Sequence, residues 1–405
     1  MNALFVIHYP VYGGPHNQAR LLAQELRRRG VSMTVLLPEG PGNAVERLKS
    51  SDIDVVTMPL HRARATLNPG PLVRLAAGLP PEIRAMRDVI RKRQIDVVQL
   101  GGLVNPHGAI AAKLENKAVI WQLLDTRPPI AVRRLLMPFV LRLSDVVMTT
   151  GRQVASVHPG TDSLGDRLLT FFPPVDPAVF AVAHVDSISA REHFGFDEGD
   201  LVIGTVGNLN PQKGHEHLLR AAARTHTGRP NTKVLIVGAS HETHLPYERG
   251  LHALAERLGL VVGKDVIFSG ALEDVRPALA AMDIFALSSV PRSEGAPTAV
   301  AEAMMMNLPV VAADVGAVSE LVADGVTGFL VPPLDPRALS DAILRIADNP
   351  SLRTTMGARG RTEAIRLSSV DECARVHLEG YARALTHRRE YARPTKRSPR
   401  VSSRR

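Results

Sequence analysis

Two glutamates, Glu294 and Glu302, occupy a setting that is hard to explain without a ligand. Glu294 lies in a loop of small residues, whereas Glu302 lies in a mostly apolar stretch with helical spacing. A carboxylate in apolar surroundings is costly unless something binds it. Pro297 and Thr298 predict where that helix begins, because proline is favoured at the first helical position.

The residues around this helix start predict a particular chemistry. The amides near Gly295, Ala296 and Thr298 would face an anion, as the amides of other helix N-termini do. Glu302, one turn into the helix, would accept hydrogen bonds from a pair of sugar hydroxyls, and Glu294 would reach a second polar group. The pattern therefore predicts recognition of a nucleotide diphosphate that carries a sugar. The alternative, a solvated surface glutamate, suits Glu294 better than Glu302.

Two glycine-bearing turns each follow the first strand of an expected α/β unit. Gly13 and Gly14 lie in the first turn, and residues 207–214 form the second. Glycine permits close approach of the backbone to a ligand. Lys213 would add a point charge beside the N–H groups of a helix that begins near His215. Neither turn matches the GxGxxG or GxxxxGK[ST] pattern, and a tight turn with a solvated lysine is the alternative interpretation.

The elements that must position these residues alternate along the chain. Short apolar runs rich in β-branched residues alternate with helical patterns, which predicts parallel sheets covered by helices on both faces. In the first half the expected strands are 3–9, 31–38, 54–60, 96–102, 118–124 and 145–150, with a helix over 18–30. Six further apolar runs follow from residue 201 onward.

This alternation predicts an α/β fold of two doubly wound, Rossmann-like domains that face a ligand cleft. The first domain is expected over 1–180 and the second over 190–365, joined by a proline-rich linker over 171–200. A last helix, from about 366 to 389, is expected to pack back on the first domain. Residues 390–405 read as a basic disordered tail.

Composition limits the function classes. The net charge is +9, but aromatic residues make up only 4% and do not alternate with the basic stretches, so nucleic-acid binding is not expected as the main role. The single cysteine, Cys373, excludes an internal disulfide and is typical of a reducing compartment. The sequence shows no leader pattern and no apolar run of about 18 residues, so we expect a soluble cytoplasmic protein.

Several motifs together resemble glycosyltransferase family 4. They are "YGG" in the first turn, "VGNLNPQKG" (206–214) and the stretch 293–333, which ends in a hairpin-like "DGVTGFLVPP". The resemblance runs to about residue 385 and implies the GT-B fold. It also implies retaining, metal-independent transfer of a sugar, most often from a UDP-sugar, to an acceptor hydroxyl. Acceptors in cell-envelope polysaccharide or glycolipid synthesis are expected.

The resemblance also implies a role for each matching residue. Glu302 would bind the donor ribose, and Glu294 would contact the transferred sugar. Amides at 296–298 would hold the sugar and phosphate. Lys213 would neutralise the diphosphate as the leaving group gains charge. Gly14 would let the first-domain loop close against the donor.

The sequence departs from the family pattern in two places. Asn208 stands where members carry an arginine that binds phosphate. One of the two cationic phosphate ligands is therefore missing, unless Arg292 substitutes for it. Gln122 stands where many members carry a histidine near the reacting carbon; it could hydrogen-bond a sugar hydroxyl, and Asp125 could serve as the acceptor-side base. His107 is another candidate, with a structural role as the alternative.

Two other functions stay open. A catalytically silent sugar-nucleotide-binding protein is motivated by the two departures, and a sugar-nucleotide epimerase is less consistent with the glutamate pair. A peripheral contact with an anionic membrane is also expected. The stretches 71–94 and 127–145 mix apolar residues and arginine at amphipathic spacing, and the basic tail would add attraction.

Overall fold

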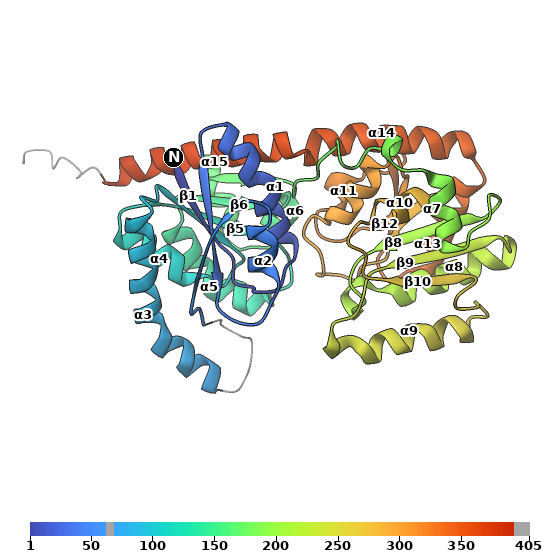
Figure 1. The fold of residues 1–405 in the computed structure, drawn as a ribbon, viewed down its shortest axis with the longest axis horizontal. Coiled ribbons are helices and arrows are strands. Elements are labelled where there is room, and N and C mark those ends of the chain that lie inside the picture. The colour runs from blue at the N-terminus through green and yellow to red at the C-terminus, as the bar shows by residue number, and fades with distance from the viewer. Residues whose placement is uncertain (62–68, 393–405) are drawn as a thin grey trace, which may run out of the picture.

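The computed structural model describes residues 1–61 and 69–392, which form two α/β domains side by side (Figure 1). The first domain holds a seven-stranded parallel sheet in the order β3-β2-β1-β4-β5-β6-β7. Its strands are β1 (Asn2–Val6), β2 (Ser32–Pro38), β3 (Asp54–Met58), β4 (Val97–Gly101), β5 (Ala118–Leu123), β6 (Val146–Thr149) and β7 (Leu168–Thr170). Nearly every residue of β2 and β5 is buried, as expected for strands that are covered on both faces.

Helices cover both faces of this sheet. One face packs against α1, α2 and α15, and the other packs against α3, α4 and α5. The helices of the domain are α1 (Gly14–Arg28), α2 (Ala44–Lys49), α3 (Pro69–Lys92), α4 (Pro106–Leu114), α5 (Ile130–Leu143), α6 (Arg152–Ser156) and the 3-10 helix η1 (Thr161–Arg167). The expected helix over 18–30 therefore begins earlier, directly at the glycine pair.

The second domain repeats the same topology with six parallel strands in the order β10-β9-β8-β11-β12-β13. They are β8 (Leu201–Val206), β9 (Thr232–Val237), β10 (Val266–Gly270), β11 (Ile284–Leu287), β12 (Val310–Ala313) and β13 (Gly328–Val331). The hairpin suggested by "DGVTGFLVPP" is wrong, because β13 pairs parallel to β12. The register Val310↔Gly328 leaves no room for a Cβ at Gly328, which would lie 2.0 Å from the Val310 carbonyl oxygen.

The helices of the second domain follow the same pattern. They are α7 (Ser187–Phe194), η2 (Val182–His184), η3 (Pro211–Lys213), α8 (His215–Gly228), η4 (Glu242–His244), α9 (Leu245–Arg257), α10 (Arg276–Ala281), α11 (Thr298–Met305), α12 (Val318–Leu321), α13 (Pro336–Ala347) and α14 (Pro350–Ser368). α13 shows how the sequence sets such a start: the Asp335 side chain accepts from the amides of Arg337 and Ala338. The expected linker is thus partly helical, because α7 occupies its end.

The last helix, α15 (Val370–Ala392), returns to the first domain, while α14 lies over the second (Figure 1). A buried polar network attaches α15 to the sheet. His377 Nδ1 donates to the Cys373 carbonyl (2.7 Å), so Nε2 accepts from the side-chain amides of Gln18 (3.1 Å) and Gln122 (2.9 Å). Burial lowers the pKa of His377 to about 4, which keeps this ring neutral near pH 7.

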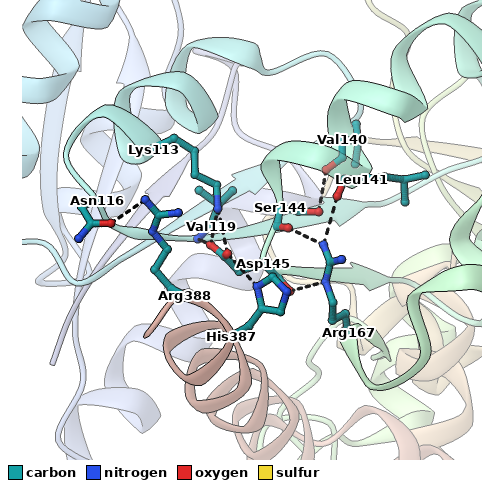
Figure 2. A network of polar contacts seen from close by, with 10 residues as sticks. All are labelled: Lys113, Asn116, Val119, Val140, Leu141, Ser144, Asp145, Arg167, His387 and Arg388. Atoms are coloured by element: carbon teal, nitrogen blue, oxygen red, sulfur yellow. Dashed lines mark hydrogen bonds and ion pairs between the residues drawn. The ribbon is translucent and has the colours of Figure 1, made fainter. Parts of the chain in front are cut away.

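A second network holds the final turns of α15 (Figure 2). The buried carboxylate of Asp145, just before β6, accepts from Lys113 Nζ (2.8 Å) on α4 and lies 3.0 Å from His387 Nδ1. Arg388 donates to the Asn116 side chain (2.6 Å). These contacts fix the helix to the amino ends of the strands, on the side opposite the loops that carry the candidate site.

Two predictions about charged segments need correction or lie outside the structure. α15 continues to Ala392, so the predicted disordered tail cannot begin at residue 390, and residues 393–405 lie outside the described residues. Residues 62–68 also lie outside them, and the amphipathic stretch 71–94 is mainly α3.

Candidate active site

The two glycine-bearing turns lie at corresponding points of the two sheets. β1 is flanked by β2 and β4, and β8 is flanked by β9 and β11, so the strand order reverses at both positions. Ligands of such sheets bind in the crevice outside the carboxyl ends of the strands at this reversal. The turn after β1 holds Gly13 and Gly14, and the turn after β8 spans residues 207–214.

Open space lies in front of the first glycine pair. A Cβ built on Gly13 or Gly14 would meet no atom within 4 Å. The turn is held from behind by buried His16, whose Nδ1 accepts from the Gly13 amide (3.1 Å) while Nε2 donates to the Tyr9 carbonyl (2.9 Å). Burial lowers the pKa of His16, so the ring stays neutral and keeps both bonds. The sequence analysis did not identify this histidine.

The second turn brings Lys213 to Glu294. Lys213 Nζ donates to Glu294 Oε1 (2.7 Å), and Ser289 Oγ donates to the same oxygen (2.6 Å). Glu294 is only 6% exposed. Gly214 allows this approach, because it has φ +59° and its Cβ would lie 2.2 Å from the Ser288 carbonyl oxygen. The solvated-glutamate alternative is therefore wrong for Glu294.

Asn208 lies in the same turn, but its side chain is exposed. No hydrogen bond of that side chain occurs within the described ranges. The neighbouring Leu209 is buried and anchors the turn in the domain core. Asn208 is thus placed at the crevice without a second positive charge beside Lys213.

Glu302 lines a cavity of about 710 Å³ between the domains. Other walls of the cavity come from α1, from the linker, from residues 273–276 after β10 and from the junction of α14 with α15. No described residue forms a hydrogen bond with its carboxylate. Burial raises the pKa of Glu302 to about 7. A ligand-sized cavity with the unpaired carboxylate of Glu302 in its wall suits a molecule that offers hydroxyl donors.

Helix α11 begins directly at the crevice. Its N-cap is Pro297 and its first residue is Thr298. The helix therefore begins one residue later than predicted, since Pro297 was expected at the first helical position. The amides of Ala296 and Thr298 donate to no atom among residues 1–61 and 69–392. Unpaired amides at a helix start are donors for an anion or a sugar oxygen.

The two domains touch at the same loop. Thr126 Oγ1, after β5, donates to the Glu294 carbonyl (3.2 Å). A Cβ on Gly295 would lie 2.0 Å from the Leu124 carbonyl oxygen, so only glycine permits this contact. Asp125 is therefore close to the Glu294 loop, although its carboxylate already accepts from the Arg127 backbone amide (3.1 Å) and Nε (3.2 Å).

Two predicted site residues do not reach the crevice. Gln122 is fully buried, and its side chain points to His377 of α15, so the predicted sugar contact is wrong. Successive side chains of β5 point to opposite faces of the sheet, which sends Gln122 under α15. His107 is buried at the start of α4, with Nε2 3.0 Å from Glu82 Oε2, which supports the structural alternative.

Other relevant side chains were missed by the sequence analysis. Thr126 and Ser289 hold the Glu294 loop, and each follows a strand end, which is the only local signal they carry. Within the described part of the chain, no cluster of three or more His, Cys, Asp or Glu side chains could hold a metal ion. Within the same part, no helix is long and apolar enough to cross a bilayer.

Comparisons with known proteins agree with this architecture. The family model "Glycosyl transferase 4-like domain" matches residues 13–158, and "Glycosyl transferases group 1" matches residues 200–349. One matches the domain with the glycine pair, and the other matches the domain with Lys213, Glu294 and Glu302. The chain belongs to glycosyltransferase family 4.

Relatives and solved structures add detail. A Corynebacterium glutamicum protein named GDP-mannose-dependent monoacylated alpha-(1-6)-phosphatidylinositol monomannoside mannosyltransferase is 29% identical over 70% of this chain and 75% of its own length. A D-inositol 3-phosphate glycosyltransferase of Nocardioides is 34% identical over 59% of this chain and 50% of its own length. The match thus spans about half of that relative.

Two crystal structures share the GT-B fold. Anabaena HepE in complex with UDP has a TM-score of 0.77 at 22% identity, covering 94% of this chain and 100% of that one. A glycosyltransferase from Rickettsia africae has a TM-score of 0.79 at 19% identity, covering 95% and 98%. At these identities the likeness establishes the fold alone.

Proposed function

We propose that this protein is a retaining, metal-independent glycosyltransferase. It moves a hexose from a nucleotide-diphosphate sugar to an acceptor hydroxyl, in the synthesis of a cell-envelope polysaccharide or glycolipid. The observation that carries the proposal is the Lys213–Glu294 pair, which lies at the crevice with the open glycine turn of the first domain and with Glu302 in the cavity wall.

In the proposed complex the diphosphate lies between Gly13–Gly14 and Lys213. The amides of Ala296 and Thr298 bind phosphate or sugar oxygens, and Glu302 accepts from the ribose hydroxyls. Lys213 stabilises the charge that develops on the leaving group, an effect that is strong in a site closed to water.

The transfer step exchanges one bond at the anomeric carbon. The bond from that carbon to the phosphate oxygen breaks, and a bond to the acceptor oxygen forms on the same face. The acceptor proton passes to the leaving phosphate oxygen, and the nucleoside diphosphate departs. Glu294 contacts the sugar while it carries positive character. Asp125, held by Arg127 in the first-domain loop beside Glu294, is the proposed acceptor-side base: it accepts a hydrogen bond from the acceptor hydroxyl and so assists the proton transfer to the leaving phosphate oxygen.

Our proposals for the donor base and the acceptor depend on this first proposal. A UDP-sugar is our first candidate, because the resemblance to glycosyltransferase family 4 most often implies this donor. GDP-mannose is the second, because one relative is named for its dependence on GDP-mannose. The named relatives act on phosphatidylinositol mannoside or inositol 3-phosphate, so we propose a phosphorylated polyol or glycolipid as acceptor.

Nucleotide release tests the proposal. UDP-, GDP- and ADP-sugars are first ranked by the rise in melting temperature that each causes, since a ligand bound only to the folded state stabilises it. The best donor is then incubated with inositol 3-phosphate or phosphatidylinositol vesicles, with and without a chelator. Release that needs acceptor and survives the chelator supports a metal-independent transferase. Donor binding without release with any acceptor supports the silent alternative, and an α-linked donor that gives a β-linked product refutes retention.

We further propose that the first domain contacts an anionic membrane through α5. The outward side of this helix exposes three large apolar side chains: Ile130, Leu135 (68%) and Phe139 (60%). Arg134 and Arg142 are exposed on the same helix. Apolar side chains flanked by arginine suit a lipid interface, where each cation near an anionic surface adds about 1 kcal/mol.

Co-sedimentation with neutral and anionic vesicles at low and high salt tests this contact. A Leu135→Ser/Phe139→Ser double variant should lose binding to anionic vesicles. The matched control is Leu245→Ser, because Leu245 is exposed in the second domain. A chain that ends at Ala392 measures what the basic tail adds. Equal sedimentation of the double variant and the wild type would remove α5 from the proposal.

A further inference from the structure

Apart from Glu302 in the cavity wall, the buried charges of the described residues are almost all paired. Among the residues that the structure describes, the other buried acidic and basic side chains are Glu82, Arg133, Asp145, Asp265 and Glu294. The four carboxylates have a histidine or lysine partner within 3.0 Å. Arg133 has no carboxylate partner in the described part of the chain. A buried cation without a counter-ion is unfavourable, so this position calls for an anion.

Arg133 is held in place but not satisfied. It lies in the first turn of α5 and is 6% exposed. Its Nη1 donates to the Val157 carbonyl at the end of α6, whereas its Nε has no partner. The helix therefore carries an oriented guanidinium with a free donor on its inner side, next to the β5–α5 loop that contacts the Glu294 loop.

A second arginine, Arg292 of the other domain, acts electrostatically on Arg133. Arg292 is exposed and precedes Glu294 by two residues, with φ +64°, a left-handed conformation that is rare for arginine. Burial first, and the charge of Arg292 second, lower the pKa of Arg133. His158 and Asp125 also lie nearby, because the pKa of His158, lowered mainly by burial, responds to the charges of Arg133 and Asp125. The charge of Arg292 therefore acts on Arg133 from the other domain.

We propose that Arg133 and Arg292 form a binding site for a phosphate group on the acceptor, an inference that rests on the proposed function. The donor diphosphate has its own partners in Lys213 and the glycine turn. Arg133 belongs instead to the domain assigned to the acceptor, on the helix that follows the loop where Thr126 contacts the backbone of Glu294. Guanidinium groups match the geometry of phosphate oxygens and bind them through paired hydrogen bonds.

Binding of inorganic phosphate tests the site without any transfer reaction. The melting temperature of the full-length protein is measured against phosphate concentration, in a Lys213→Ala background so that the donor site contributes less. Phosphate should raise the melting temperature of the Lys213→Ala protein. It should also do so when Arg134→Met is added as a control, because that substitution changes the exposed neighbour of Arg133 on α5. Arg133→Met should weaken phosphate binding at least about tenfold, the loss expected for a charge-assisted hydrogen bond. Arg292→Gln, an exposed change, should weaken it in the same direction.

Each outcome decides the proposal. If phosphate causes no shift in the Lys213→Ala background, or if Arg133→Met responds like Arg134→Met, the site is refuted. If Arg133→Met fails to fold, an unchanged response of Arg292→Gln refutes it. Without phosphate, Arg133→Met is expected to be at least as stable as its parent, because it removes a buried unpaired charge.

Activity then identifies the source of the phosphate. With the best donor, KM is compared for inositol 3-phosphate, for myo-inositol and for phosphatidylinositol in vesicles. Arg133→Met should raise KM at least about tenfold for the phosphorylated acceptor that is used, with the donor KM unchanged. Equal loss with myo-inositol would refute phosphate recognition. A phosphate shift without transfer to any acceptor would leave the site in place and contradict the proposed function instead.

Discussion

Removal of Lys213 tests how the crevice is held together. In the wild-type structure Glu294 is 6% exposed, and in Lys213→Ala the remaining donor to its carboxylate is Ser289 Oγ at 2.6 Å. Breaking a fully buried pair by removing one partner costs about 3–5 kcal/mol. Lys213 is 26% exposed, so water can reach the carboxylate and we expect a loss of about 1–3 kcal/mol in the free energy of unfolding.

A double-mutant cycle with Glu294→Gln isolates the pair. Glutamine keeps the shape of the side chain but removes the charge, so Lys213→Ala should cost at least about 1 kcal/mol less in that background. Urea unfolding of the four proteins gives the coupling, with Lys49→Ala as the matched control, because Lys49 is exposed and forms no ion pair with any described residue. Additive effects within about 0.5 kcal/mol would refute the pairing.

The kinetics of the same variants separate structure from catalysis. If Lys213 also binds the diphosphate, turnover at subsaturating donor should fall at least about tenfold beyond any loss of folded protein. Because Glu294→Gln removes the internal partner without restoring a cation, it should not rescue this loss. Full rescue of turnover in the double variant would mean that Lys213 serves only to hold Glu294.

Three further predictions concern neighbouring residues. Glu302→Ala should mainly weaken donor binding, whereas Glu294→Ala should mainly lower kcat; steady-state kinetics would contradict the assigned roles by showing the reverse. Between pH 4.5 and about 7, Glu302 is protonated in the folded protein but ionised in the unfolded chain. Its contribution to the free energy of unfolding should therefore fall by up to about 3 kcal/mol as pH rises through that window. Glu302→Gln should abolish this term in urea titrations. Gln122→Ala should lower the melting temperature and leave the donor KM unchanged; a raised KM would return Gln122 to the site.

The parts of the site that the sequence predicts are those with local causes. Pro297 and Thr298 place the start of α11 within one residue, because helix starts depend on nearby side chains. The alternation of strands and helices predicts both sheets, although the three-residue β7 and helix α7 within the linker are too short to show a period. The location of the glycine turns follows from the strands that precede them.

The parts that could not be predicted depend on contacts between distant segments. β5 is buried along its whole length, so its sequence gives no sign of which face Gln122 takes. Arg133 and Arg134 are adjacent in sequence, yet one is buried and the other is exposed. Neighbouring side chains of a helix point in different directions, and the contact of Arg133 with Val157 through space leaves no pattern in the local sequence.

Three glycines show how these two kinds of information meet at the crevice. At Gly14 a side chain would meet open space, whereas at Gly214 and Gly295 it would collide with the backbone oxygens of Ser288 and Leu124. The first glycine leaves room for a ligand, the second brings Lys213 to Glu294, and the third lets the two domains meet beside Glu294. The sequence indicates that glycine is needed at such turns, but only the fold identifies what approaches each one. Lys213 and Glu294 are therefore positioned by close backbone contacts at Gly214 and Gly295, where a side chain would not fit. This is why the distance between the two charged groups follows from the fold rather than from their spacing in the chain.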